Sequence, residues 1–212
     1  MEKYIALKTD IIRSKKILHR DKAQEQFLST AQAVNRRFDF ISSFVVTHGD
    51  EAQGLLAAAS AGMLYEIVEF LTESMAPYPL RFGYGYGDLN TRLQQMAIGM
   101  DGPAWQRAND AIGNARSSHI QVRMKGFNPG VERGIEVLAN MLLWFHGRWT
   151  KEQCEAIALL RGGLSQTEAA RRLKVSEVAV SKRLAAAGWR YYNEGKQALG
   201  ILLPQAVLTI ES

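Results

Sequence analysis

The sequence contains 212 residues, 47% of them hydrophobic, with a formal net charge of +5 at pH 7, which is enough apolar material for one large domain or one domain with a smaller one. Its single cysteine, Cys154, excludes an internal disulfide and a cysteine-cluster zinc site. The chain has no run of eighteen apolar residues and no signal-type N-terminus, so we expect a cytoplasmic protein that does not bind membranes.

The positive charge is unevenly distributed along the chain. Residues 1–147 hold 16 Lys and Arg against 15 Asp and Glu, a difference of +1. Residues 148–212 hold 10 against 6, a difference of +4. We therefore expect a polyanionic partner to bind the C-terminal third first.

The first predicted strand, over residues 4–7, leads to an aspartate, Asp10, where the strand would pass into a loop. A Gly-Asp-Glu stretch lies between two later apolar runs, and β-forming segments joined through a glycine are typical of a hairpin. If the two strands are neighbours, Asp10 and Asp50 converge at one edge of a sheet, where carboxylates can hold Mg²⁺ or Mn²⁺ with bound phosphates. The alternative is that Asp50 and Glu51 are solvated turn residues and Asp10 caps a turn, because Gly-Asp is a frequent turn dipeptide.

Basic residues follow Asp10 and lead into a helix predicted over residues 21–37. They would meet phosphates bound at the metal, or they would form a solvated helix entry. Arg13 and Lys15 are therefore candidate nucleotide-binding residues. The full basic set is Arg13, Lys15, Lys16, Arg20 and Lys22.

The next pattern predicts strands over residues 41–46 and 51–57, an amphipathic helix over 60–75, and a strand over 80–88. In this last strand, glycines at alternate positions clear one face while aromatic residues fill the other. A bare face admits either a nucleotide or a tightly packed helix. Under the first interpretation, Gly83 and Gly85 are candidate nucleotide-binding residues.

The succession strand, helix, hairpin, helix, strand is that of a ferredoxin-like palm, an antiparallel sheet with helices on one face. A loop over residues 96–103, a helix over 104–115 and a strand over 120–124 follow. A long helix then carries an apolar stripe, which either packs into the core, connects the parts of the chain or supports self-association.

The C-terminal part predicts short helices with clear ends. Thr150 opens a helix that runs through Leu160, Ser165 and Glu168 form a capping box, and Ser176 caps a helix that Gly188 ends. Two short capped helices with a tight turn between them indicate a helix-turn-helix. Residues 205–210 would add a small strand or dock their apolar residues on the core.

In a helix-turn-helix the second helix, here residues 177–184, enters the major groove of duplex DNA. Val178, Ser181 and Lys182 are placed to reach base edges, and nearby basic residues to contact phosphates. The alternative is a helical hairpin that binds protein. The predicted phosphate contacts are Arg171, Arg172, Lys174, Arg183 and Arg190.

These elements together predict an α+β protein with three parts. Residues 1–128 would form a ferredoxin-like palm domain and residues 129–149 a connecting helix. Residues 150–212 would form an all-α helix-turn-helix domain.

Five motifs resemble the SatD family of small bacterial proteins, and the resemblance covers nearly the whole chain. The resemblance implies this architecture of two domains joined by a connecting helix. The motifs are DIIRS at residues 10–14, THGDEAQGLL at 47–56, RFGYG at 81–85, MAIGMDGPA at 96–104 and AVSKRLAAAGW at 179–189.

The N-terminal motifs are also similar to class III nucleotide cyclases and GGDEF-type diguanylate cyclases, whose two metals sit on a first-strand Asp and a hairpin acid. That resemblance implies Asp10 and Asp50 as metal ligands, with Glu51 as a third. In cyclases a later helix supplies an Asn and an Arg to the transferring phosphoryl group. Here the Asn is missing and Arg107 corresponds only approximately, so ligand binding could survive where turnover does not.

Two functions remain open from the sequence. We expect a DNA-binding, transcription-regulating protein that binds double-stranded DNA as a homodimer, with a palm domain that senses a nucleotide or a metal, Mg²⁺ or Mn²⁺. The alternative is an enzyme, a Mg²⁺- or Mn²⁺-dependent nucleotidyl cyclase or nucleotide polymerase, whose helix-turn-helix either determines its location or recognises its trigger.

Overall fold

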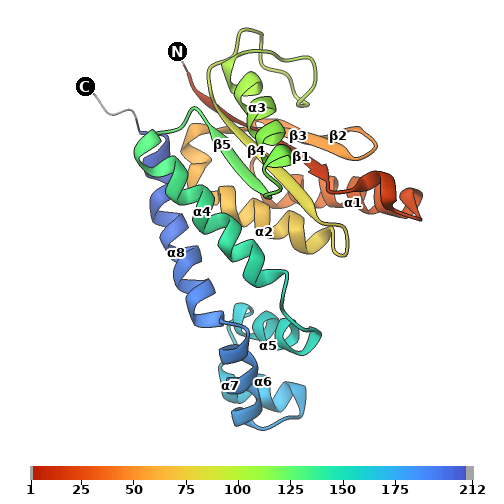
Figure 1. The fold of residues 1–212 in the computed structure, drawn as a ribbon, viewed down its shortest axis with the longest axis vertical. Helices are drawn as coiled ribbons and strands as arrows, with labels where there is room; N and C mark the ends of the chain where they lie inside the picture. Colours follow the sequence, from red (N-terminus) through yellow and green to blue (C-terminus); the bar gives the residue numbers. More distant parts are fainter. Residues whose placement is uncertain (1, 209–212) are drawn as a thin grey trace. The chain divides into compact units, whose positions relative to one another are not determined.

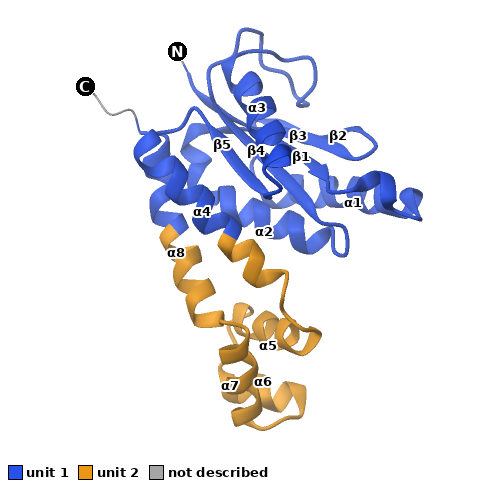
Figure 2. Cartoon of the chain, in the orientation of Figure 1, with its two compact units in different colours: residues 1–140, 199–212 blue, residues 141–198 orange. Residues whose placement is uncertain are grey.

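The computed structural model describes residues 2–208. The chain divides into two compact units, one within residues 1–140 and 199–212 and the other within residues 141–198 (Figure 2). The second unit is therefore inserted between two segments of the first. Two helices, α4 (Pro129–His146) and α8 (Trp189–Ala206), carry the chain from one unit into the other.

A five-stranded sheet forms the centre of the first unit (Figure 1). The strand order is β2-β3-β1-β4-β5; β4 and β5 pair in parallel and the other neighbours are antiparallel. The succession β1-α1-β2-β3-α2-β4 is that of the ferredoxin-like motif, which agrees with the α+β prediction. The strands are β1 Tyr4–Ile11, β2 Ser42–His48, β3 Glu51–Ala57, β4 Leu80–Gly87 and β5 Val122–Lys125.

Helices cover both faces of this sheet (Figure 1). Helices α1 (Arg20–Arg37) and α2 (Leu64–Ser74) lie on one face, where the buried Tyr84 hydroxyl of β4 donates a 3.0 Å hydrogen bond to the Leu64 carbonyl oxygen. Helix α3 (Pro103–Ser117) lies on the other face. The predicted helix over residues 60–75 begins later than expected, because residues Ala58–Met63 form a 3₁₀ turn.

The glycine face of β4 is filled by helix α3. A Cβ on Gly83 would lie 2.5 Å from the Ile112 backbone nitrogen and 2.7 Å from the Ala108 carbonyl oxygen, and one on Gly85 would meet the backbone of Ala104 and Ala108 more closely still. No ligand can enter this space. The prediction that Gly83 and Gly85 bind a nucleotide is therefore wrong, and the helix-packing alternative is the one that the structure has.

The C-terminal turns of α8 complete the core of the first unit. Leu199, Leu203 and Ala206 are buried, and the Ala206 carbonyl oxygen accepts a 2.8 Å hydrogen bond from the Asn128 backbone N–H. The second unit thus ends earlier than the predicted range 150–212. The sequence prediction missed this helix. Of its two alternatives for residues 205–210, a small strand or apolar residues docked on the core, the buried Ala206 agrees with docking; residues 209 and 210 lie outside the described residues.

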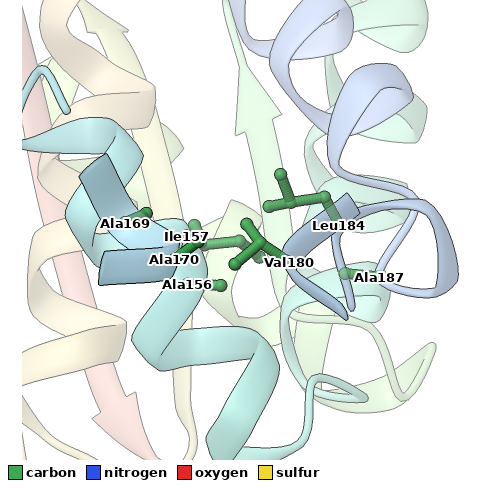
Figure 3. Close-up of a cluster of buried hydrophobic side chains, with 7 residues drawn as sticks. All are labelled: Ala156, Ile157, Ala169, Ala170, Val180, Leu184 and Ala187. Atoms are coloured by element: carbon green, nitrogen blue, oxygen red, sulfur yellow. The ribbon is translucent and has the colours of Figure 1, made fainter. Parts of the chain in front are cut away.

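The second unit contains α5 (Lys151–Arg161), α6 (Gln166–Leu173), α7 (Glu177–Ala186) and the first turns of α8. Its small core is built mostly from alanines, which let the three short helices approach closely (Figure 3). Beside it, the Trp149 indole donates a 2.9 Å hydrogen bond to the Ala187 carbonyl oxygen. The core residues are Ala156, Ile157, Ala169, Ala170, Val180, Leu184 and Ala187.

A membrane span is not found among the helices of the described residues, because none of them is both long and apolar enough to cross a bilayer.

The close approach of β4 to α3 predicts a large effect of a single methyl group. Gly85→Ala should lower the free energy of unfolding of the first unit by about 3 kcal/mol, because its Cβ would meet backbone atoms that cannot rotate away. Thermal denaturation followed by circular dichroism measures the change. Gly113→Ala on α3, where a Cβ meets nothing within 4 Å, is the matched control and should gain up to about 1 kcal/mol from helix propensity. Equal melting temperatures for the two variants would contradict the packing described here.

Candidate functional site

The acidic residues singled out in the sequence meet at one end of the sheet. Asp10 on β1 pairs with Glu51 on β3, and Gly49 and Asp50 form the two-residue turn between β2 and β3. The Asp50 carbonyl oxygen accepts a 3.0 Å hydrogen bond from the Ile11 backbone N–H, which holds the hairpin turn against the end of β1. The predicted hairpin and its proximity to Asp10 are therefore confirmed.

These residues line an open pocket of about 520 Å³, which we call the β1-end pocket. Its walls come from the end of β1, the loop that follows, the β2-β3 turn, the start of β4 and the last turn of α3. The lining residues are Asp10, Ile11, Arg13, Ser14, Lys15, Lys16, Asp50, Glu51, Arg81 and Arg116.

Asp10 is buried and is bound by two arginines. One nitrogen of the Arg81 guanidinium group donates to both carboxylate oxygens of Asp10, at 2.8 and 3.0 Å. Arg116 donates to Oδ2 of the same carboxylate at 2.6 Å. The aspartate is only 3% exposed and Arg81 9%, so the pair is shielded from water and its charges are held close together.

Arg116 connects this buried pair to the surface of the pocket. Its side chain is 59% exposed and lies 3.7 Å from the Glu51 carboxylate. The hydrogen bond to Asp10 raises the pKa of the Arg116 guanidinium, with further contributions in the same direction from the nearby charges of Asp10, Glu51 and Asp50. The group is therefore a fixed positive charge at the pocket wall.

Three further basic residues lie on the loop after β1. Arg13 adopts a left-handed backbone conformation, with φ of 58°, and turns the chain into the 3₁₀ segment Ser14–Lys16. The side chains of Arg13, Lys15 and Lys16 are exposed and line the pocket. The structure thus places both predicted nucleotide-binding residues of this loop, Arg13 and Lys15, beside Asp10 and Asp50.

The arrangement of donors does not fit the predicted divalent metal site. Both oxygens of Asp10 are already bound by guanidinium groups, and a metal ion would have to displace them from a buried carboxylate. In the part of the chain that the structure describes, no three acidic, histidine or cysteine side chains are grouped so that they could hold a metal ion. Asp10, Asp50 and Glu51 are neighbours, but arginines pair with Asp10 and lie near Glu51, and only Asp50 has no such partner among the described residues.

Arg81 and Arg116 are the functional candidates that the sequence interpretation missed. It considered Arg107 on the same helix as Arg116, but Arg107 donates a 2.6 Å hydrogen bond to the Tyr86 carbonyl oxygen, near the opposite end of β4 from Arg81. A signal was present in the strand periodicity. Arg81 and Gly83 are two residues apart, so their side chains lie on the same face of β4, the face that α3 covers. A basic residue in the last turn of α3 was therefore within reach of Asp10.

The second candidate surface lies on α6 and α7. Ser165 and Glu168 form the predicted capping box, in which the Ser165 hydrogen bonds lower the pKa of Glu168. Lys174 ends α6 in a left-handed conformation, with φ of 55°, and the Ser176 hydroxyl accepts a 3.2 Å hydrogen bond from the Ala179 N–H at the start of α7. The tight turn between two capped helices is therefore present as predicted.

The residues predicted to contact DNA are mostly solvent-exposed. Val178, Ser181 and Lys182 share one exposed face of α7, while Val180 and Leu184 on the opposite face enter the alanine-rich core. Val178 is 63% exposed. Arg190 is also exposed, but it lies on α8 and forms a 3.0 Å ion pair with Glu194. Arg171, Arg172 and Lys174 are exposed, and Arg183 is half-buried.

Comparison with protein families identifies the chain. The model of the SatD family matches residues 4–203. The chain belongs to the SatD family. A search of curated proteins found no match.

Solved structures similar to this SatD-family chain include two of a bacterial light-regulated adenylyl cyclase, both with a TM-score of 0.46. One is 11% identical, with 58% of this chain and 75% of that chain covered; the other is 10% identical, with 58% and 43% covered. The GGDEF domain of YfiN from Pseudomonas aeruginosa is 19% identical, with 60% of this chain and 84% of that chain covered and a TM-score of 0.43. Likeness at this level carries no conclusion about activity.

The buried pair predicts that Asp10 is needed for stability. Asp10→Ala should lower the free energy of unfolding by about 3–5 kcal/mol, because it leaves the Arg81 guanidinium buried without its counter-charge. Urea denaturation measures the change. Asp50→Ala, which removes an acid from the hairpin turn without breaking a buried pair, should cost less than about 1 kcal/mol. A cost for Asp10→Ala as small as that of Asp50→Ala would contradict the structural role of this pair.

Proposed function

We propose that this SatD-family chain is a DNA-binding regulator. Its second unit would bind duplex DNA as a helix-turn-helix, and its first unit would bind a nucleotide or another phosphorylated ligand in the β1-end pocket. The observation that carries the proposal is the exposed face of α7, where an apolar residue, a hydroxyl and a lysine are presented together and nothing within this unit covers them.

The chemistry of this face suits a major groove. A valine can contact a thymine methyl group, and serine and lysine can hydrogen-bond to base edges. Arg171, Arg172 and Lys174 on the preceding helix and turn are exposed and supply charges for the flanking phosphates. A helical hairpin that binds protein would not need this density of basic residues.

The first unit supports the ligand part of the proposal through its charges. Loop, strand and helix residues that are far apart in the sequence bring basic side chains to one open pocket beside Asp10. Phosphate groups are recognised by such sets of arginine and lysine donors. The resemblance of the N-terminal sequence motifs to those of nucleotide cyclases suggests a nucleotide as the ligand.

The DNA proposal predicts different effects for two variants of α7. Lys182→Ala should weaken binding of the full-length chain to duplex DNA by about tenfold and reduce the slope of log affinity against log salt by about one. Val178→Glu should abolish binding, because it places a negative charge against the DNA at an exposed position that the core does not use. Fluorescence anisotropy over a salt series measures both.

The matched control is Lys22→Ala on α1, which removes the same charge from an exposed position of the other unit. Its DNA affinity should stay within about twofold of the original chain. Unchanged DNA affinity in both α7 variants would contradict the proposal that α7 binds DNA. It would favour the alternative, a helical hairpin that binds protein.

An enzyme is the second candidate function, a Mg²⁺- or Mn²⁺-dependent nucleotidyl cyclase or nucleotide polymerase. The meeting of Asp10, Asp50 and Glu51 at one pocket favours it. Two observations argue against an enzyme. Two guanidinium groups are bound to Asp10, and Arg107 lies away from the pocket.

Incubation of the chain with each nucleoside triphosphate and Mn²⁺ separates the two candidates. We expect no cyclic or polymeric product by liquid chromatography, because the carboxylate that would hold the metal is bound to arginines. Asp50→Ala serves as the control for contaminating activity. A product that the original chain forms and Asp50→Ala does not would establish the enzyme instead.

A further inference from the structure

The β1-end pocket contains more positive than negative charge. Five basic and three acidic residues line it, and five minus three gives a net formal charge of +2. Arg81 and Arg116 are bound to Asp10, whereas the exposed Arg13, Lys15 and Lys16 show no carboxylate partner among the described residues. These three side chains are therefore available to an incoming anion.

This net positive charge favours an anionic ligand over a divalent cation in the pocket. A divalent cation would enter a region of net positive charge and compete with two guanidinium groups for Asp10. An anion would instead meet three free cations and the outward part of the Arg116 guanidinium, whose side chain is 59% exposed. Arginine donors can bind phosphate oxygens in pairs, as they do carboxylates.

We propose that the β1-end pocket binds a polyphosphate chain directly on arginine and lysine side chains, without a divalent cation. This proposal rests on the proposed function and adds to it the chemical class of the ligand. Arg13, Lys15, Lys16 and Arg116 contact the phosphate oxygens. Asp10 is a positioning residue, because its buried carboxylate holds the guanidinium groups of Arg81 and Arg116 beside each other at the pocket wall.

The two hairpin acids take a role opposite to that of metal ligands. Asp50 lines the pocket, and no hydrogen bond or ion pair of its carboxylate is found in the described chain, so it repels an incoming phosphate chain. Removing its charge raises the net charge of the pocket lining from +2 to +3. The sign of the effect of Asp50 therefore distinguishes direct binding from binding through a metal.

Isothermal titration calorimetry of the full-length chain with sodium tripolyphosphate in EDTA tests the proposal. Binding should occur in EDTA and should weaken when Mn²⁺ replaces EDTA, since the ion competes for the ligand. Arg116→Ala should weaken binding by about tenfold, the effect of losing one charge-assisted contact. Asp50→Asn should tighten it by about two- to threefold, as expected from a modest change in surface charge.

Two variants control for other cationic surfaces and for unfolding. Arg92→Ala, on the exposed loop between β4 and α3, and Lys151→Ala, on α5, should leave tripolyphosphate affinity unchanged. Thermal melting of each variant establishes that it is folded; Asp50→Asn breaks no buried pair and keeps the test decisive if Arg116→Ala is unstable. A loss of affinity in Lys151→Ala or Arg92→Ala equal to that in Arg116→Ala would show that the ligand binds outside the pocket and would overturn the proposal.

Other outcomes separate this proposal from the proposed function. Binding only in Mn²⁺, or weaker binding by Asp50→Asn, would overturn direct recognition and leave a metal-dependent ligand site. No binding of tripolyphosphate under either condition would overturn both the proposal and the ligand part of the proposed function. Titration with ATP in EDTA then identifies the source: affinity above that of tripolyphosphate indicates a nucleotide, equal affinity indicates the phosphate chain alone, and both support the proposal.

Discussion

The buried ion pair between Asp10 and Arg81 is the constraint on which the first unit and its pocket depend. A buried carboxylate is costly without partners, and here it accepts hydrogen bonds from guanidinium groups on β4 and on the last turn of α3. The pair therefore links the central strand to one neighbouring strand and to the helix above them. The same contact bears on the chemistry of the pocket, because a metal ion at Asp10 would have to displace guanidinium groups from a buried carboxylate.

The position of Arg116 depends in turn on the glycines of β4. Gly83 and Gly85 allow α3 to lie against the strand at backbone contact, and the last turn of that helix then reaches the end of β1. Larger residues would lift the helix away and with it the second arginine. The alternating glycines thus determine where Arg116 lies at the pocket, by setting how close α3 can come to the strand.

The sequence was sufficient to predict most of the strands, the hairpin tip at Gly49 and Asp50, and the capped helices of the second unit, because each has a local signal in periodicity, turn residues or caps. It did not reveal which partner fills the bare face of β4 or neutralises Asp10, since α3 comes from a segment some distance along the chain. Helix α8 was missed because it contains Pro204 and Gly200, and both residue types usually mark the ends of helices. Asp10, Arg81 and Arg116 lie together because of the order of the strands in the sheet and the length of α3. No local sequence motif predicts this contact.

The insertion of residues 141–198 within the first unit has a consequence for folding during synthesis. Leu199, Leu203 and Ala206, which are buried in the first unit, leave the ribosome only after the whole inserted segment has done so. Because domains generally fold as units as they emerge, the small helical unit can reach its native state while the larger one still lacks part of its core. The apolar surface that awaits the end of α8 is then the part of the nascent protein most exposed to chaperones and to aggregation.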